Sequence, residues 1–190
     1  TVPMPKLNGS HQVDNAGVAI AALNELGCSC RHISESMRKV HWPGRLQRVT
    51  NGALSPNNLG FKADLFIDGG HNPSAGTALA SWVRQLEPST FFLILGIMKN
   101  KDLKGFLSPF GTTIHQLIAV NIPEEINAQD KDTIAKTSNR MGIPSKVASS
   151  IESALYDIKK VNSLLPKIIL ITGSLYLVGQ FLKMNSSRSH

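Results

Sequence analysis

Three short apolar runs, each ended or followed directly by glycine, constrain the fold of this 190-residue chain more than any other feature. They lie at residues 63–68, 91–96 and 168–172, and segments with the apolar spacing of helices separate them. Apolar strands that alternate with helices are typical of βαβ units, in which helices cover both faces of a mostly parallel sheet. The sequence therefore predicts an α/β fold, and ligands of such sheets bind at the carboxyl ends of the strands.

The rest of the chain after residue 42 continues this alternation. Residues 51–60 contain Gly, Pro and Asn and are expected to form a turn between strands. Further elements follow from the same patterns. We predict strands at 46–50, 114–120 and 145–147, and helices at 73–86, 102–110, 128–141, 151–161 and 175–182.

The start of the chain has a helical pattern without strands. Apolar residues at 15–26 recur at the spacing of one helical face, and a second, short helix is predicted at 34–40 with Ser34 as its cap. A Pro-Gly pair then interrupts the pattern. We therefore expect a helical segment at 1–41 and an α/β domain at 42–190.

Composition indicates a folded, basic protein. Hydrophobic residues make up 42% of the chain, charged residues 17%, and the formal net charge is +7. A basic chain favours anionic partners, but charge does not choose among nucleic acid, membrane surface, nucleotides and polycarboxylates. Cys28 and Cys30 are too close for an unstrained disulfide, and no second Cys or His pair follows at the spacing of a zinc site. We expect reduced thiols at a helix end and a cytoplasmic protein.

The strongest candidate site follows the first apolar run, from Asp68 to Pro73. Asp68 brings a carboxylate to the end of a strand, two glycines permit a sharp turn, and Asn72 can cap the next helix, whose N-terminus attracts anions. Asp68 could bind a hydroxyl pair such as a ribose, could hold a cation, or could only fix N–H groups of the turn. His71 is a candidate catalyst, although a lone loop histidine is more often structural.

Other polar residues follow the remaining strands. Lys99 and Lys101 could bind phosphate or carboxylate, or could be solvated surface charges. Ser174 could donate to a carboxylate or cap the last helix. Arg45 follows a rigid Pro-Gly turn and suits bidentate phosphate binding; the alternative is a surface ion pair beside a packed Trp42. The chain contains no Gly-x-x-x-x-Gly-Lys-Ser/Thr loop, so it has no P-loop of its own.

Five short motifs occur in order along the chain. They are Asn8-Gly-Ser-His11-Gln12-Val-Asp-Asn15-Ala16, Trp42-Pro-Gly-Arg45-Leu-Gln47, Asp68-Gly-Gly-His71-Asn72-Pro73, Gly96-Ile-Met-Lys-Asn-Lys-Asp102 and Thr172-Gly-Ser174-Leu-Tyr176. Together they resemble the folylpolyglutamate synthase and dihydrofolate synthase branch of the Mur ligase family. The resemblance spans nearly the whole chain. It implies a Rossmann-like C-terminal ligase domain from about Trp42 onward, preceded by the helical end of a central ATPase domain.

The resemblance also implies a function. Enzymes of this branch use ATP to join L-glutamate to folate or dihydropteroate through an acyl phosphate. By position in the motifs, Asn15 would lie near the adenine, Arg45 would contact phosphate and Asp68 would bind the ribose, while His71 and Ser174 would lie at the reacting or glutamate end. The P-loop, the main Mg²⁺ ligands and much of the folate site would lie upstream, in an N-terminal ATPase domain of the same protein. The chain alone is therefore expected to be inactive.

Other interpretations remain open on sequence grounds. The same ligase class could use a different acceptor, such as a peptidoglycan precursor, although the second and third motifs favour the folate branch. The chain could also be a nucleotide-binding module without catalysis. A nucleic-acid binder is disfavoured because no basic stripe interleaved with aromatic residues occurs. We expect neither a nucleic-acid nor a membrane partner.

Overall fold

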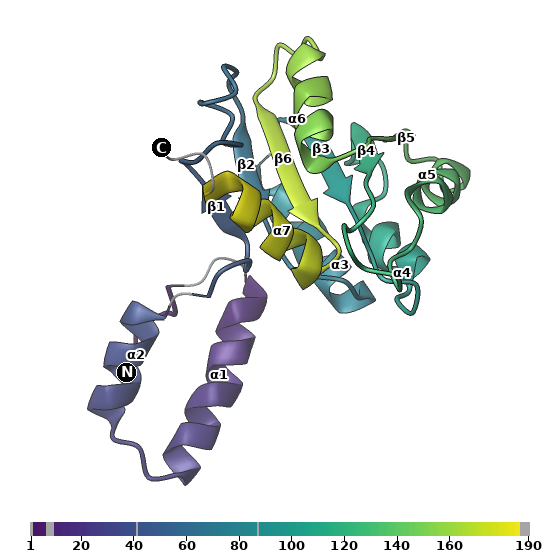
Figure 1. Ribbon diagram of the computed structural model, residues 1–190. Coiled ribbons are helices and arrows are strands. Elements are labelled where there is room, and N and C mark those ends of the chain that lie inside the picture. Colours follow the sequence, from purple (N-terminus) through teal and green to yellow (C-terminus); the bar gives the residue numbers. More distant parts are fainter. Residues whose placement is uncertain (1, 7–9, 41, 87, 187–190) are drawn as a thin grey trace.

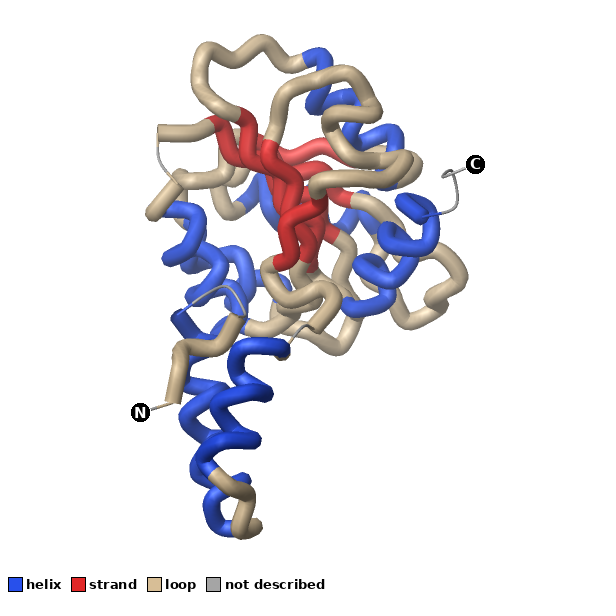
Figure 2. The backbone as a smooth tube through the Cα atoms, turned by 90° about the vertical axis from the view of Figure 1, so that its left-hand side faces the viewer, coloured by secondary structure: helices blue, strands red, loops and turns tan. Residues whose placement is uncertain are grey.

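The computed structural model describes residues 2–6, 10–40, 42–86 and 88–186. Two helices form an antiparallel hairpin, and the rest of the described chain forms a sheet with helices on both faces (Figure 1). The hairpin consists of α1 (Ser10–Glu25) and α2 (Cys30–Lys39). It projects from one end of the sheet unit (Figure 2).

In the described residues the sheet has six strands in the order β1-β2-β6-β3-β4-β5. Of these strands, β1 is antiparallel to its neighbour and the others pair in parallel, so the sheet is mostly parallel, as predicted. The last strand along the chain, β6, lies between β2 and β3, and this places the three predicted apolar runs side by side. The strands are β1 (Gln47–Val49), β2 (Asp64–Ile67), β3 (Thr90–Leu95), β4 (Gln116–Ala119), β5 (Ser145–Val147) and β6 (Lys167–Thr172).

Helices cover both faces of the sheet because alternate side chains of the apolar strands point to opposite sides. One core packs α3, α4, a 3₁₀ turn and α5 against residues such as Leu93 and Leu170. The other packs α6 and α7 against residues such as Ile94 and Ile171. The helical elements are α3 (Pro73–Arg84), α4 (Leu103–Leu107), the 3₁₀ turn (Ser108–Phe110), α5 (Lys131–Arg140), α6 (Ile151–Lys160) and α7 (Leu175–Ser186).

The predicted order of elements is confirmed. Every strand lies within two residues of its predicted bounds. The predicted helix at 102–110 begins one residue later than expected, because Asp102 is the N-cap of α4. It is also divided, because its last turn tightens to a 3₁₀ helix at Ser108. The prediction for the second helix was wrong at its start: Ser29, whose side chain accepts from the backbone N–H of His32, is the cap, and Ser34 lies inside α2.

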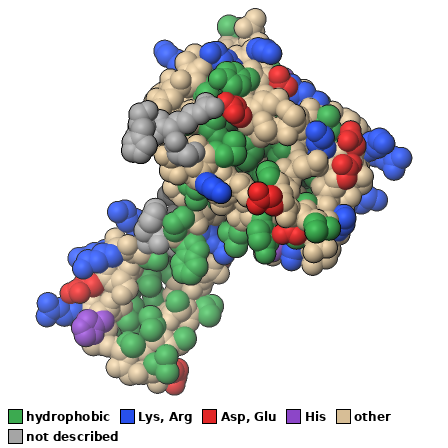
Figure 3. Space-filling model, in the orientation of Figure 1, with side chains coloured by type: hydrophobic (Ala, Val, Ile, Leu, Met, Phe, Trp, Pro, Cys, Tyr) green, Lys and Arg blue, Asp and Glu red, His purple; other side chains and the backbone are tan. Residues whose placement is uncertain are grey.

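The helical hairpin leaves many apolar side chains exposed. Figure 3 shows hydrophobic side chains gathered along its length. Ala16 is buried, but Leu26, on the same predicted face, is 79% exposed, and Val18 is 73% exposed. Cys28 lies between the two helices and Cys30 is the first residue of α2; both are free and exposed. No helix in the described part of the chain is both long and apolar enough to cross a membrane.

Candidate functional site

The candidate site lies at the carboxyl edge of the three central strands. The loops after β2, β6 and β3 meet there and are joined by backbone hydrogen bonds. Gly173 N–H donates to the carbonyl of Gly70 at 3.0 Å, and Gly96 N–H donates to the carbonyl of Thr172 at 3.3 Å. The sheet order therefore brings together three motifs that are far apart in the sequence.

The side chain of Asp68, directly after β2, is buried and fixed by two hydrogen bonds from the backbone. Its side chain is 3% exposed, and its two carboxylate oxygens accept from different backbone groups. Oδ1 accepts from Gly70 N–H at 2.7 Å, and Oδ2 accepts from Leu46 N–H at 2.8 Å. The alternative that Asp68 fixes N–H groups of the turn is thus realised.

The turn before β1 is bound tightly to the loop after β2. Gly44 has φ of +74°, and a Cβ there would lie 2.8 Å from Val178 Cγ1. Leu46 also has positive φ, at +42°, which is costly for a branched residue. Asp68 stabilises this conformation through the Leu46 N–H, and Gly44 accepts from Gly69 N–H at 2.8 Å. These contacts fix the backbone on both sides of Arg45.

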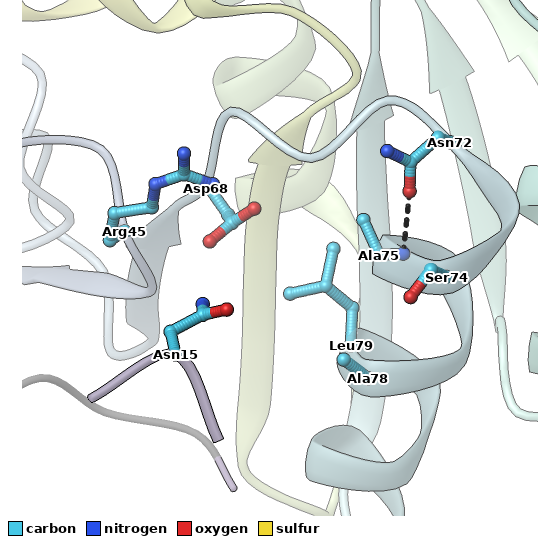
Figure 4. Close-up of a pocket in the computed structure, with 8 residues that line it drawn as sticks. All are labelled: Asn15, Arg45, Asp68, Asn72, Ser74, Ala75, Ala78 and Leu79. Atoms are coloured by element: carbon cyan, nitrogen blue, oxygen red, sulfur yellow. Dashed lines mark hydrogen bonds between the residues drawn. The ribbon is translucent and has the colours of Figure 1, made fainter. Parts of the chain in front are cut away.

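The predicted nucleotide-binding residues line one pocket, which we call pocket A (Figure 4). Asn15 comes from α1, Arg45 from the turn before β1, and Asp68 from the end of β2. The first turns of α3 form the opposite wall. Pocket A has a volume of about 220 Å³ and is lined by Asn15, Arg45, Asp68, Asn72, Ser74, Ala75, Ala78 and Leu79.

The helix that forms this wall begins as the sequence predicted. Asn72 is the N-cap of α3, and its Oδ1 accepts from Ala75 N–H at 2.8 Å, the bond drawn in Figure 4. Pro73 occupies the first turn, where a missing N–H has no cost. The N-terminus of α3 thus adds a positive dipole end to the guanidinium of Arg45, so pocket A suits an anion.

The two predicted catalytic residues line a second pocket, pocket B. His71 and Ser174 meet there, and Lys101 adds a cation. Pocket B has a volume of about 250 Å³ and is lined by His71, Met98, Asn100, Lys101, Gly173, Ser174, Leu175 and Tyr176. Because small-molecule sites usually have volumes of roughly 300–1,000 Å³, each pocket resembles part of a site.

Both predicted catalytic side chains already have hydrogen-bond partners. Nδ1 of His71 lies 2.9 Å from the carbonyl oxygen of Gly69. A carbonyl only accepts, so Nδ1 carries the hydrogen and Nε2 is the acceptor of the neutral ring. Ser174 is 2% exposed, and its Oγ accepts from Tyr176 N–H at 3.0 Å. Ser174 therefore caps the first turn of α7, one of its two predicted roles.

Lys99 and Lys101 have the same candidate roles in the sequence but lie in different surroundings in the structure. Lys101 lines pocket B, whereas Nζ of Lys99 donates to the carbonyl of Ile126 at 3.1 Å, outside both pockets. The alternative interpretation of Trp42 as packed at a domain edge is wrong, because its side chain is 60% exposed. Three polar pocket residues had been given no role from the sequence; each lies in a motif or next to one. They are Ser74, Asn100 and Tyr176.

Part of the first motif cannot be placed. Asn8 and Gly9 lie outside the described residues, and the side chain of His11 is likewise not described. Asn15, in the same motif, is described, and its amide donates to Oε1 of Gln12 at 3.3 Å. Within the described ranges, no group of three or more His, Cys, Asp or Glu side chains could hold a metal ion.

Comparison with known proteins gives consistent matches. Residues 54–184 match the family described as "Dihydrofolate synthetase, C-terminal domain". The chain is 29% identical over 176 residues to a probable bifunctional folylpolyglutamate synthase/dihydropteroate synthase of Halobacterium salinarum, covering 92% of this chain and 20% of that protein. It is 28% identical over 197 residues to the dihydrofolate synthetase of Saccharomyces cerevisiae, covering 95% of this chain and 45% of that protein.

A solved structure has the same fold. Folylpolyglutamate synthase of Mycobacterium tuberculosis, complexed with ADP and AMPPCP, superposes with a TM-score of 0.76 at 23% identity and covers 95% of this chain and 41% of that one. The chain thus spans less than half the length of each relative named here. Because the family match covers more than half of its residues, the chain belongs to the family of dihydrofolate synthetase C-terminal domains.

Proposed function

We propose that this chain is the C-terminal domain of an ATP-dependent ligase that adds L-glutamate to a folate or to dihydropteroate. The observation that carries the proposal is the meeting of two small pockets at one sheet edge. Pocket A gathers Asn15, Arg45 and Asp68, and pocket B gathers His71 and Ser174. Family membership and the relatives' names support the same reaction class.

Pocket A would hold part of the ATP. Arg45 is exposed at its mouth and presents a planar, permanently charged group that matches phosphate oxygens. Asp68 lies beside it as an acceptor for ribose hydroxyls, and the amide of Asn15 would contact the adenine. The Mycobacterium tuberculosis relative binds ADP and AMPPCP, which supports a nucleotide as the ligand.

Pocket B would hold the glutamate and the reacting groups. Lys101 supplies a cation for a carboxylate, and the Ser174 hydroxyl hydrogen can be donated while its oxygen caps α7. His71 presents Nε2 as a hydrogen-bond acceptor. In the proposed reaction the γ-phosphate passes to a carboxylate of the folate substrate, the glutamate amine attacks the acyl phosphate, and phosphate leaves. Such chemistry depends on positioning and charge neutralisation.

The remaining parts of the site would come from outside this chain. Both pockets are small for the ligands proposed, and the exposed apolar side chains of the α1–α2 hairpin fit its assignment to the end of a central ATPase domain. That domain would hold the P-loop and the Mg²⁺ ligands, and Mg²⁺ would neutralise phosphate charge. We propose that the boundary between the two domains lies near residue 42. Closure of the α/β domain onto the ATPase domain would then exclude water from the acyl phosphate.

Transfer of labelled glutamate tests this proposal. The 190-residue chain and the longer protein that contains it would be incubated with ATP, Mg²⁺ and labelled glutamate. Dihydropteroate, a reduced folate and a peptidoglycan precursor would be supplied separately as acceptors. We expect a labelled pterin product from the longer protein only. Labelling of the peptidoglycan precursor alone would assign another amino-acid ligase, and nucleotide binding without any transfer would favour a non-catalytic module.

A further inference from the structure

Thr172 is a buried polar residue at the end of an otherwise apolar strand. It is the last residue of β6, follows Ile168–Ile171, and is 0% exposed. Its backbone pairs with Leu95 of β3, as a valine in the same place would do. The hydroxyl group is therefore not needed for the strand itself. Oγ1 donates a hydrogen bond of 3.2 Å to the carbonyl oxygen of Gly70, 102 residues earlier in the chain.

The peptide groups of Gly70 are anchored on both sides by this arrangement. Its carbonyl accepts from Thr172 Oγ1 at 3.2 Å and from Gly173 N–H at 3.0 Å. Its N–H donates to Oδ1 of Asp68 at 2.7 Å. There is little space for adjustment, because a Cβ on Gly70 would lie 2.8 Å from that same carboxylate oxygen and 2.9 Å from Ala75 Cβ.

The loop that contains Gly70 serves both pockets. Asp68 lines pocket A and His71, three residues later, lines pocket B. The imidazole of His71 is oriented by the carbonyl of Gly69, the neighbour of the anchored glycine. Thr172 itself lines neither pocket, yet it holds the peptide between the two side chains that do.

We propose that Thr172 is a positioning residue for both pockets: its buried hydroxyl fixes the Gly70 carbonyl and thereby sets where Asp68 and His71 point. Its effect on catalysis rests on the proposed ligase function, whereas its effect on His71 does not. Loss of the hydroxyl would leave the carbonyl with the Gly173 N–H alone and would loosen the Gly69–His71 contact, so that His71 would lose its preference for hydrogen on Nδ1.

Three variants isolate the hydroxyl. Thr172→Val keeps the shape and β-branching and removes the donor, whereas Thr172→Ser keeps the donor and removes a methyl group. Thr90→Val is the matched control: Thr90 is also a buried strand residue, but its hydroxyl lies 2.5 Å from Ser163 Oγ in a loop at the opposite edge of the sheet. The imidazole ¹⁵N signals of His71 would be recorded by NMR for each 190-residue chain at a pH where the ring is neutral.

We expect wild type, Thr172→Ser and Thr90→Val to show hydrogen on Nδ1, and Thr172→Val to show a mixture with hydrogen on Nε2. In the longer protein, Thr172→Val should lower kcat about tenfold and raise the KM for ATP, whereas Thr172→Ser should keep both near the wild-type values.

An unchanged His71 signal in folded Thr172→Val would overturn the proposal. If Thr172→Val does not fold, the His71 imidazole signals of Thr172→Ala test the proposal instead, because alanine also lacks the hydroxyl. A shifted signal without any ligase activity in the wild type would refute the proposed function and leave the positioning role intact.

Discussion

The backbone N–H of Leu46 donates to Oδ2 of Asp68 at 2.8 Å, across 22 residues of sequence. This bond joins the turn that carries Arg45 to the strand end that carries Asp68. It also stabilises the positive φ of Leu46, a conformation that the residue would otherwise avoid. Asp68 is therefore both a wall of pocket A and a support for the neighbouring Arg45.

Replacement of Asp68 should accordingly affect stability as well as ligand binding. Asp68→Asn can accept from only one of the two N–H groups, because its amide nitrogen cannot accept from the other. A buried N–H without a partner costs about 1–3 kcal/mol, so urea unfolding of the chain should show a loss of that size. An unfolding free energy equal to that of wild type would contradict the role of both bonds.

Arg45 offers a cleaner test of ligand binding, because its side chain is exposed and its removal should not destabilise the fold. A hydrogen bond to a charged group contributes about 1.5–3 kcal/mol, so Arg45→Ala in the longer protein should lower kcat/KM for ATP roughly 10- to 100-fold. Arg45→Lys should restore only part of this, because lysine lacks the bidentate geometry. Arg140→Ala, another exposed arginine far along the sheet in α5, is the control and should change little.

A larger side chain on the α3 wall of pocket A should block nucleotide binding while every charged residue stays in place. Ala78 lies on α3, lines the pocket and is half-buried. Ala78→Leu suits a helix and adds volume where the ligand would lie, so the thermal midpoint should change little. The KM for ATP should rise at least tenfold in the longer protein. Wild-type ATP kinetics in a folded Ala78→Leu variant would place the nucleotide elsewhere.

Replacing each of two helical glycines by alanine should change the free energy of unfolding in opposite directions. A Cβ at Gly76 of α3 would lie 2.2 Å from the carbonyl oxygen of Phe106, whereas one at Gly179 of α7 would meet nothing within 4 Å. Gly76→Ala should destabilise the chain by about 1–3 kcal/mol through overpacking. Gly179→Ala should stabilise it by about 0.5–1 kcal/mol through helix propensity. Denaturant unfolding of both variants checks the signs, and equal effects would refute the close approach of α3 to the segment at Phe106.

The sequence predicted the sheet well because its strands are continuous apolar runs that are buried on both faces, as in β3, where all six residues are buried. It placed the start of α2 wrongly, because Ser29 and Ser34 are both good caps and only the folded hairpin distinguishes them. Most residue types of the site could also be predicted, since Asp68, His71 and Ser174 follow strands and Arg45 follows a Pro-Gly turn. Asn15 lies on α1 and was singled out only through the family resemblance.

The orientation of individual side chains could not be predicted in the same way. Lys99 and Lys101 lie two residues apart in one turn, and only the fold sends Lys99 to the carbonyl of Ile126 and Lys101 to pocket B. The positive φ of Leu46 has no local signal either, because it depends on a carboxylate 22 residues away. Contacts of this kind come from tertiary structure and are invisible in a single sequence.

The most direct test of the proposed ligase function is phosphate release from ATP by the longer protein that contains this domain. We expect release that requires both glutamate and a folate or dihydropteroate acceptor, and that falls at least tenfold in Arg45→Ala but not in Arg140→Ala. Release that is independent of the pterin acceptor, or equal in the two arginine variants, would contradict a folate–glutamate ligase whose ATP lies in pocket A.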